Sequence, residues 1–565
     1  MAGGRKKKIA GVCTEDKMVS VLCNWIYILF TTTCLGYGFS KLVIKKLNYQ
    51  IKKFESLIAI GLVIATVYAQ FFSLFYKVGL IANIALVSIC IFICIIFRKD
   101  FYNDIRNHFA NTSVAKRIII LFLIVFWAYF SSRGYMHYDS DLYHAQSIRW
   151  IEEYGVIKGL GNVHNRLAYN SSFFAVSALY SMKFLVGQSL HSINGFMTLL
   201  LSISVLDIMD SIKRKRFILS DYIRIATIYY LTVICDEIVS PASDFAIMCT
   251  IFYIVIKWVD LLEKKEKDIA PYALLCVGGV YAVSLKLTAG LVLILLIKPA
   301  YRLIKEKKVK EIFIYLSMGF IVILPWVIRN VIISGYLVYP FPELDIFSFA
   351  WKIDPNFAAK DAAEIKVWGR GLYDVALVDM PVWQWFENWF KSSLSGTEKL
   401  IILADIVCLV IALIITVYVF VKKKWEHLDY LLVELMIICS YGFWQLSAPL
   451  IRYGYAYALI LIVLTLGFIK MHIGFDKIVY YGIIILGIVK LLILLKYAHG
   501  FWYFGNYLWQ KDYGIYETES YEIEGEIFYY PALGDQIGYE PFPAVSEKKE
   551  LEFIGDEIRD GFIGR

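Results

Sequence analysis

Long uninterrupted runs of hydrophobic residues, rather than short amphipathic repeats, dominate the chain. As helices, runs of about 20 residues span the ~30 Å hydrocarbon core of a bilayer. Lipid offers the backbone no hydrogen-bond partners, so the runs must be helical. The pattern predicts an all-α polytopic membrane protein with about 14 transmembrane helices. The predicted spans are 19–40, 54–76, 78–97, 117–133, 189–210, 220–236, 241–262, 271–285, 287–300, 312–333, 399–421, 428–447, 451–470 and 476–496.

The loops between these spans alternate in character. One set is short and basic, and includes "KKLNYQIKK", "KRKR", "EKKEKD", "KEKKVK" and "VKKKWEH". The other set contains the long segments 134–188 and 334–398 and the tail from residue 497. Basic loops stay in the cytoplasm, so the second set is expected on the external side of the membrane, together with the C-terminus. The "RKKK" at 5–8 conflicts with this orientation, unless translation starts at Met18 or one span is miscounted.

These features divide the chain into seven parts. The C-terminal part is rich in Pro, Gly and aromatic residues, which predicts a small external domain of irregular and strand structure. The parts are an N-terminal extension 1–17, helices 18–133, an external acidic loop with surface helices 134–188, helices 189–333, an external aromatic-rich loop 334–398, helices 399–496 and the C-terminal domain 497–565.

The amino-acid composition of the chain argues against several classes of function. Hydrophobic residues make up 59% of the chain, and the net charge of +8 comes from short basic loops. That distribution is typical of membrane topology and argues against nucleic-acid binding. Nearly all of the 10 cysteines lie in hydrophobic runs, without metal-ligand spacing, so neither a disulfide framework nor a Cys-based metal site is expected.

The stretch "HYDSDLYHAQSIRWIEEYG" at 137–155 begins the first large external loop. Asp139, Asp141 and His144 form a D-x-D-x-x-H pattern, in which Asp141 and His144 share a helix face. Such a group predicts a catalytic base or the ligands of a divalent metal at the membrane surface. The alternative is that the aspartates cap the following helix. His164 and Arg166, in "GNVHNRLAYNSS", add more polar groups than capping needs.

Four ionisable residues lie within or next to predicted spans, where charge is costly and often functional. Asp244 lies in "CDEIVSPASD", and Lys286 in "YAVSLKLTAGLVL", between two short runs. Arg329 in "PWVIRN" and Arg452 in "APLIRYGYAYAL" lie near external ends of spans. Arginine donates paired hydrogen bonds to phosphate, which predicts an anionic-lipid site. The alternatives are snorkelling of each arginine to the headgroups and pairing of Lys286 with Asp244.

These motifs resemble the GT-C class of membrane glycosyltransferases, which use polyprenyl-phosphate sugars. "YDSD" resembles the acidic motif of their first large external loop, "SPASD" their second external turn and "SLKLTAG" their lysine-bearing hairpin. "PWVIRNVIISGYLVYP" and "APLIRYGYAYAL" resemble later cationic segments of the class. The order of motifs agrees over residues 117–470, but more spans precede the acidic loop than is usual, and the tail is smaller. More narrowly, "DSDLYHAQSIRWIEEYG" and "GDQIGYEPFPA" resemble a bacterial family of polytopic proteins without an assigned reaction.

The resemblance implies an inverting transferase that moves a sugar from a polyprenyl-phosphate donor to a glycan or lipid acceptor on the external face. Asp141 or Asp139 would be the base, and His144 would bind a metal or orient that base. The remaining implied substrate-binding residues are His164, Arg166, Asp244, Lys286, Arg329 and Arg452. The alternatives are a transporter or flippase for a lipid-linked saccharide, which would need charges along a whole pathway, and a non-catalytic subunit of an envelope-assembly complex.

Overall fold

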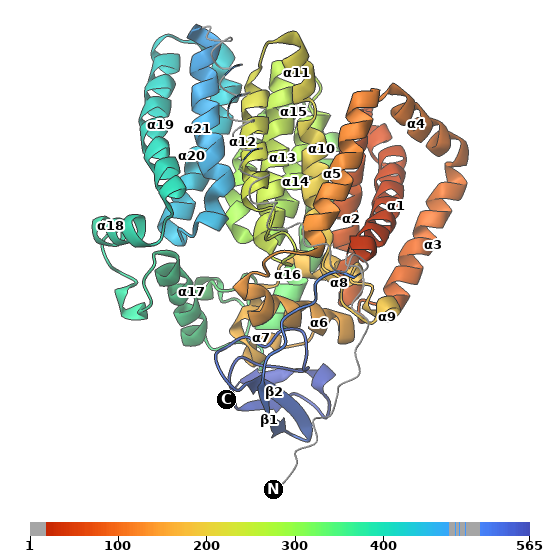
Figure 1. Ribbon diagram of the computed structural model, residues 1–565, viewed down its shortest axis with the longest axis vertical. Coiled ribbons are helices and arrows are strands. Elements are labelled where there is room, and N and C mark those ends of the chain that lie inside the picture. Colours follow the sequence, from red (N-terminus) through yellow and green to blue (C-terminus); the bar gives the residue numbers. More distant parts are fainter. Residues whose placement is uncertain (1–17, 474–480, 482–484, 486–491, 493–508, 565) are drawn as a thin grey trace.

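A computed structural model describes residues 18–473 and 509–564, and the single residues 481, 485 and 492 between them. Long helices lie side by side in one bundle, and short helices and all four strands cover one end of it (Figure 1). We call this end the loop end, and the opposite end, where α11 and α15 finish, the basic end. The N-terminal extension and most of the predicted span 476–496 fall outside the described residues.

The long helices correspond to the hydrophobic runs. They are α1 (Met18–Leu42), α2 (Phe54–Ser73), α3 (Leu80–Ile96), α5 (Val114–Ser132), α10 (Ile193–Val205), α12 (Leu219–Val233), α13 (Ser243–Glu263), α14 (Ala270–Leu285), α16 (Val309–Ser334), α19 (Gly396–Val421), α20 (Leu428–Ser447) and α21 (Ile451–Ile473). The other helices are α4 (Arg98–Asn111), α6 (Ala145–Glu153), α7 (Leu160–Val163), α8 (Ser172–Leu179), α9 (Lys183–Val186), α11 (Ile208–Arg214), α15 (Ile297–Lys305), α17 (Pro355–Gly369) and α18 (Val382–Ser392).

Among the described residues, ten helical segments are long and apolar enough to cross a membrane, or eleven if the bent pair α3–α4 counts as one span. The protein is therefore a helical membrane protein, but the predicted total of about 14 spans is not confirmed by the described residues. The difference has a simple cause. Helices α12 and α14 have 15 and 16 residues, shorter than a usual span, α3 bends by 90° into α4, and the last predicted span lies outside the described residues.

Close packing of α1 against α2 depends on two glycines. A Cβ atom added at Gly61 would lie 1.7 Å from the carbonyl oxygen of Thr32, and one at Gly36 would lie 2.0 Å from that of Leu57. Lipid gives membrane helices no hydrophobic drive to associate, so such close backbone approach provides much of their packing energy. The sequence places small residues where the two backbones meet.

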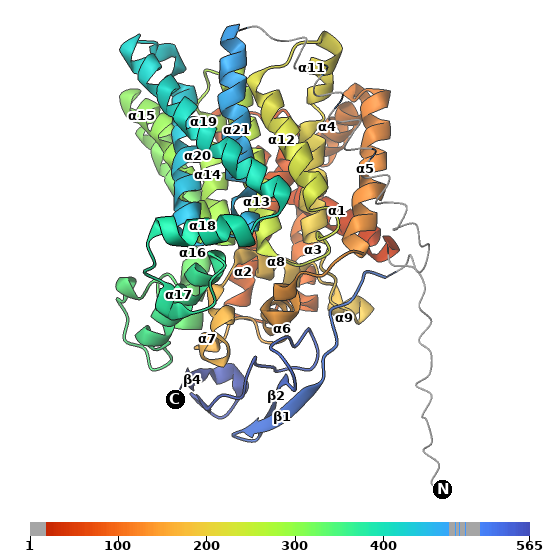
Figure 2. The ribbon, with the colours of Figure 1, turned by 60° about the vertical axis from the view of Figure 1, so that its left-hand side comes forward.

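The loop end is built from short helices and the C-terminal domain (509–564), which lies beneath α6 and α7 (Figure 2). Helix α8 has 8 residues, about 12 Å of rise, and cannot cross a bilayer. In the C-terminal domain, β1 (Thr518–Ile523) pairs with β2 (Glu526–Pro531), and β3 (Leu551–Phe553) with β4 (Phe562–Gly564), both antiparallel. Trp150 of α6 is fully buried against this domain, with its ring 5.9 Å from that of Phe562.

The aromatic-rich loop 334–398 also lies at the loop end, where it forms α17 and α18 (Figure 2). Helix α18 is amphipathic: Trp385 and Trp389 are buried, whereas Trp383 is exposed. The indole nitrogen of Trp389 donates to the carbonyl of Pro449, 2.9 Å away, just before α21. The two buried tryptophans therefore attach α18 to the bundle.

Candidate functional site

Four of the predicted site residues meet at the loop end of the bundle. The guanidinium of Arg452 lies 2.5 Å from the carboxylate of Asp139 and 3.2 Å from that of Asp244. Lys286 forms an ion pair with Asp244, and its ammonium lies 3.2 Å from the centre of the Tyr453 ring. We call Asp139, Asp244, Lys286 and Arg452 the ion cluster. It joins the acidic loop to three separate helical segments.

Each member of the ion cluster is held at the end of an element. Asp139 immediately precedes a π-helical turn, Ser140–His144, and π-turns are frequent at functional sites. Asp244 lies in the first turn of α13, where the helix dipole favours a carboxylate. Lys286 is extended, between the end of α14 and the 3₁₀ segment Leu287–Leu296. Arg452 is the second residue of α21.

The ion cluster is sheltered but can be reached from outside the protein. The side chains of Asp139, Lys286 and Arg452 keep 20%, 23% and 24% of their area exposed, whereas Asp244 is buried. Two carboxylates balance two cations, so the resting cluster is neutral. Because an anion can compete for the exposed cations, the arrangement can exchange an internal partner for a ligand phosphate.

The electrostatics of Asp139 and His137 follow from this arrangement. Burial alone would raise the pKa of Asp139, but Arg452, with His144 and His137, outweighs it and holds the pKa below the usual range. Burial and Arg452 lower the pKa of His137, so its ring is neutral and accepts a hydrogen bond from Arg452. Asp139 is therefore ionised at rest, as a base must be.

Asp141 faces away from the ion cluster and binds the C-terminal domain. Its carboxylate accepts hydrogen bonds from the backbone N–H of Gly514, at 3.0 Å, and from the hydroxyl of Tyr516, at 2.9 Å. Its carbonyl accepts from the N–H groups of Ile537 and Gly538. Burial raises the pKa of Asp141, although the hydrogen bonds that its carboxylate accepts from Gly514 and Tyr516 oppose that shift. With both carboxylate oxygens occupied, this geometry favours anchoring over catalysis, and its role as the base stays a prediction.

Replacing Asp141 by alanine is expected to loosen the C-terminal domain. The substitution removes two hydrogen bonds to a charged group, each contributing about 1.5–3 kcal/mol. Hydrogen exchange measured by mass spectrometry should become at least several-fold faster around Gly514 and Tyr516. Asp535→Ala is the matched control, because it removes only the partly exposed bond from Tyr138. Equal exchange in the two variants would contradict the anchoring role.

His144 is buried beside Asp139 but does not share a metal site with it. The His144 ring packs against Tyr143 and Phe174, with ring centres 4.4 Å and 5.2 Å away, and burial lowers its pKa to about 3. Within the described part of the chain, no group of three or more His, Cys, Asp or Glu residues is placed to hold a metal ion. Asp139, Asp141 and His144 therefore do not converge as a ligand set, because the two aspartates turn to different partners.

His164 and Arg166 connect two loops rather than joining the ion cluster. The His164 ring caps the turn that follows it by accepting from the N–H of Arg166, at 3.0 Å. The guanidinium of Arg166 lies 3.1 Å from the buried carboxylate of Asp361 in α17 and stacks on Trp368, 5.0 Å from its ring centre. The pair joins the acidic loop to the aromatic-rich loop, so both residues organise the loop end.

Acidification is expected to destabilise the protein through buried neutral histidines. Burial lowers the pKa of His164 to about 3, whereas an unfolded histidine titrates near 6.5. The unfolded state therefore binds more protons between these values, and stability falls with decreasing pH by up to ~1.4 kcal/mol per unit for each such group. Apparent Tm measured from pH 7 to 4.5 should show a shallower decline in His164→Asn, which keeps a capping acceptor. An unchanged slope would contradict the assignment.

Arg329 lies apart from the ion cluster, deep in the loop end of α16. It is 2% exposed and donates to the side-chain oxygen of Asn170, at 2.9 Å, and to the hydroxyl of Ser73. Within the described ranges, no carboxylate lies at ion-pair distance from it. Its partners tie α16 to the acidic loop and to the end of α2.

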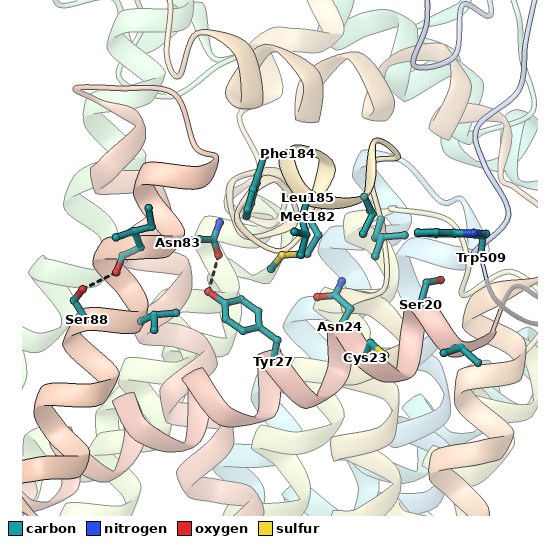
Figure 3. Close-up of a pocket in the computed structure, with 15 residues that line it drawn as sticks. Ser20, Cys23, Asn24, Tyr27, Asn83, Ser88, Met182, Phe184, Leu185 and Trp509 are labelled. Atoms are coloured by element: carbon teal, nitrogen blue, oxygen red, sulfur yellow. Dashed lines mark hydrogen bonds between the residues drawn. The ribbon is translucent and has the colours of Figure 1, made fainter.

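A cavity of about 660 Å³ lies beside α1 and α3 at the loop end (Figure 3). Its wall is almost wholly apolar and includes Val87, Leu185 and Trp509. Among its few polar groups, the hydroxyl of Tyr27 donates to Asn83, at 2.7 Å, as Figure 3 shows. None of the predicted site residues lines this cavity, and its lining suits a hydrocarbon chain.

Sequence reasoning missed three residues of the site region. His137 accepts from Arg452, the ring of Tyr453 faces Lys286, and Tyr516 binds Asp141. His137 could have been identified from the sequence, because it stands two residues before Asp139 in a polar stretch at the end of a span. Tyr516 could not have been identified in this way, because its partner Asp141 is far away along the chain.

Comparison with known proteins defines a family but no activity. No curated protein and no solved structure matches the chain. A family model described as a domain of unknown function, DUF8201, matches residues 18–459, which is most of the chain. The protein therefore belongs to the DUF8201 family.

Proposed function

We propose that the protein is a membrane glycosyltransferase that transfers a sugar from a polyprenyl-phosphate donor to an acceptor hydroxyl. The observation that carries the proposal is the ion cluster: a loop carboxylate, Asp139, lies against Arg452, with Lys286 nearby. A base beside a cationic phosphate site, at the end of membrane helices, is what transfer from a lipid-linked donor requires.

The transfer step uses these groups directly. The acceptor hydroxyl gives its proton to a carboxylate oxygen of Asp139 while its oxygen bonds to the anomeric carbon of the sugar. The bond from that carbon to the phosphate oxygen breaks, and its electron pair leaves with the phosphate. Arg452 and Lys286 stabilise the charge that grows on the departing phosphate. Attack opposite the leaving group inverts the anomeric centre.

Donor binding itself would activate the base. At rest Arg452 holds the pKa of Asp139 below the usual range, which makes Asp139 a weak proton acceptor. A donor phosphate offers Arg452 two oxygens in the geometry of its fork, and it competes with Asp139 for the guanidinium. Released from that pair, Asp139 becomes more basic only when a donor is present, which would limit wasteful hydrolysis.

The surroundings of the ion cluster support the proposal of a lipid-linked donor. The 660 Å³ apolar cavity lies at the loop end, as the ion cluster does, and would accept part of a polyprenyl chain. Since the short basic loops prefer the cytoplasm, we place the loop end and the C-terminal domain outside the cytoplasmic membrane of a bacterium. The acceptor would then be a glycan or lipid of the cell envelope.

The test is direct transfer by the purified protein. In detergent, it is incubated with a panel of radiolabelled polyprenyl-phosphate sugars and an extract of envelope glycans and lipids, with and without EDTA. We expect sugar release from one donor together with a labelled, inverted product; the EDTA arm reports whether a divalent metal contributes. No release from any donor, combined with movement of intact donor across proteoliposomes, would overturn the proposal in favour of a transporter.

A further inference from the structure

A second cavity opens toward the basic end of the bundle. It has a volume of about 520 Å³ and lies between α2, α13, α14 and α16. Helix α2 begins at the basic end, since Ser73 at its far end accepts a hydrogen bond from Val156 of the loop end. Along α2 the lining runs from Lys53 to Val67, which is about 21 Å of helix. We call this cavity the basic cleft.

The deep part of the basic cleft is built for hydrocarbon. Its walls are side chains such as Leu62, Ile254, Leu275 and Val322. With a length of about 21 Å, the cleft passes the middle of a hydrocarbon core of ~30 Å. The apolar walls offer water few hydrogen-bond partners, and an empty cleft would forfeit the dispersion contacts of those walls. A lipid chain, which the bilayer supplies at high concentration, fits the space.

The mouth of the basic cleft is cationic. Four lysines line it, and two of them are paired: Lys53 with Asp207, at 2.5 Å, and Lys257 with Glu55, at 2.9 Å. The other two, Lys52 and Lys264, are exposed and, in the part of the chain that the structure describes, have no carboxylate at ion-pair distance.

The carboxylates of the mouth do not cancel this charge. Asp260 is held by Arg224, whose guanidinium lies 2.6 Å away. Glu266 lines the mouth and keeps its negative charge, because the backbone N–H of Asp268 that donates to it, at 3.0 Å, is neutral. Basic mouths between membrane helices on the cytoplasmic side recognise anionic headgroups. The cleft thus combines apolar walls with a mouth at which two lysines without an ion-pair partner, Lys52 and Lys264, exceed one such carboxylate, Glu266, among the described residues.

We infer that the basic cleft binds an anionic glycerophospholipid. One acyl chain lies between α2, α13, α14 and α16, and the headgroup phosphate interacts with Lys52 and Lys264. The bound lipid joins the N-terminal helices to the helices that carry Asp244 and Lys286. The site is separate from the ion cluster, lies at the opposite end of the bundle, and does not depend on the proposed transferase activity.

Binding is tested on the full-length protein after removal of co-purified lipid. Phosphatidylglycerol or phosphatidylcholine is added in mixed micelles, and retained lipid is counted by native mass spectrometry. We expect phosphatidylglycerol to be retained roughly 10-fold or more better, as two lysines at the surface allow. The double variant Lys52→Ala/Lys264→Ala should lose this preference. Lys213→Ala/Lys310→Ala, which changes two exposed lysines outside the cleft, should keep it.

A second variant tests the deep apolar part of the basic cleft instead of its cationic mouth. Gly278 lines the cleft, and a Cβ atom added there would meet only the side chain of Ile254, at 3.9 Å. Leucine favours the helix over glycine, and at this position its side chain starts without a steric clash and extends into the cleft. Gly278→Leu should therefore retain less of both lipids while keeping an unchanged or higher Tm.

Three results would overturn the inference. They are equal retention of the two lipids by the wild type, full preference in the Lys52/Lys264 double variant, and full retention by Gly278→Leu. A soluble competitor distinguishes lipid from a free anion. Glycerol 3-phosphate should not displace phosphatidylglycerol, because it lacks the chain; displacement at equimolar concentration would mean that the site holds a phosphate alone.

Discussion

Asp139→Asn is expected to lower sugar transfer by roughly 10²–10⁴-fold, the usual contribution of a general base. The amide keeps the shape of the side chain and an oxygen for Arg452, but it cannot take the proton of the acceptor hydroxyl. Asp139 is also partly exposed, so the change leaves the folded core intact. Turnover with the active donor would be measured next to expression level and Tm, which should stay close to those of the wild type.

Asp141→Asn is the matched control, because it changes the neighbouring aspartate of the same motif. Its carboxylate faces Gly514 and Tyr516, so we expect most of the turnover to remain while the C-terminal domain loosens. The opposite outcome, with Asp139→Asn active and Asp141→Asn inactive, would move the base to Asp141. Full activity in both variants would show that neither aspartate of the acidic motif takes part in the reaction.

Asp361→Leu is expected to give the largest loss of stability, about 3–5 kcal/mol. Asp361 is 1% exposed and accepts from Arg166, at 3.1 Å, from Asn165, at 2.7 Å, and from the hydroxyl of Tyr339, at 3.1 Å. Removing the carboxylate takes away the buried counter-charge of Arg166 and leaves its guanidinium only the more distant, partly exposed Glu364. The free energy of unfolding, or the apparent Tm in detergent, should drop sharply.

Glu364→Gln provides the control for this effect. Glu364 lies 3.9 Å from the same guanidinium, but it is partly exposed, so its loss should cost no more than ~1 kcal/mol. If the two substitutions lowered Tm equally, the Arg166–Asp361 pair would not be the connection that holds the acidic loop to the aromatic-rich loop.

The pattern of hydrophobic residues predicts most of the helices in the membrane part, because a chain surrounded by lipid can adopt few secondary structures other than a helix. The run "IIILFLIVFWAYF" and the helix α5 coincide, and Lys286 does interrupt two short segments. The predicted number of spans stays unconfirmed where a helix is short, as in α12, or bends, as between α3 and α4. Length and bending depend on tertiary packing, which a hydropathy pattern does not contain.

The candidate site was predictable residue by residue, but not as a set of contacts. Asp139, Asp244, Lys286 and Arg452 each stand out because charge at a membrane end is costly. Which of them meet depends on helix packing across hundreds of residues. Asp141 shows the limit: its partner Tyr516 lies in a strand-bearing tail, and nothing local distinguishes an anchoring aspartate from a catalytic one.

The most direct test of the central claim is to locate a bound donor phosphate. A non-hydrolysable polyprenyl-phosphonate sugar would be added to the purified protein and its position determined by cryo-electron microscopy. We expect phosphonate oxygens at hydrogen-bond distance from Arg452 and Lys286, with the anomeric carbon facing Asp139. Phosphonate density elsewhere, for example at Arg329, or an ion cluster left intact beside the bound donor, would contradict it.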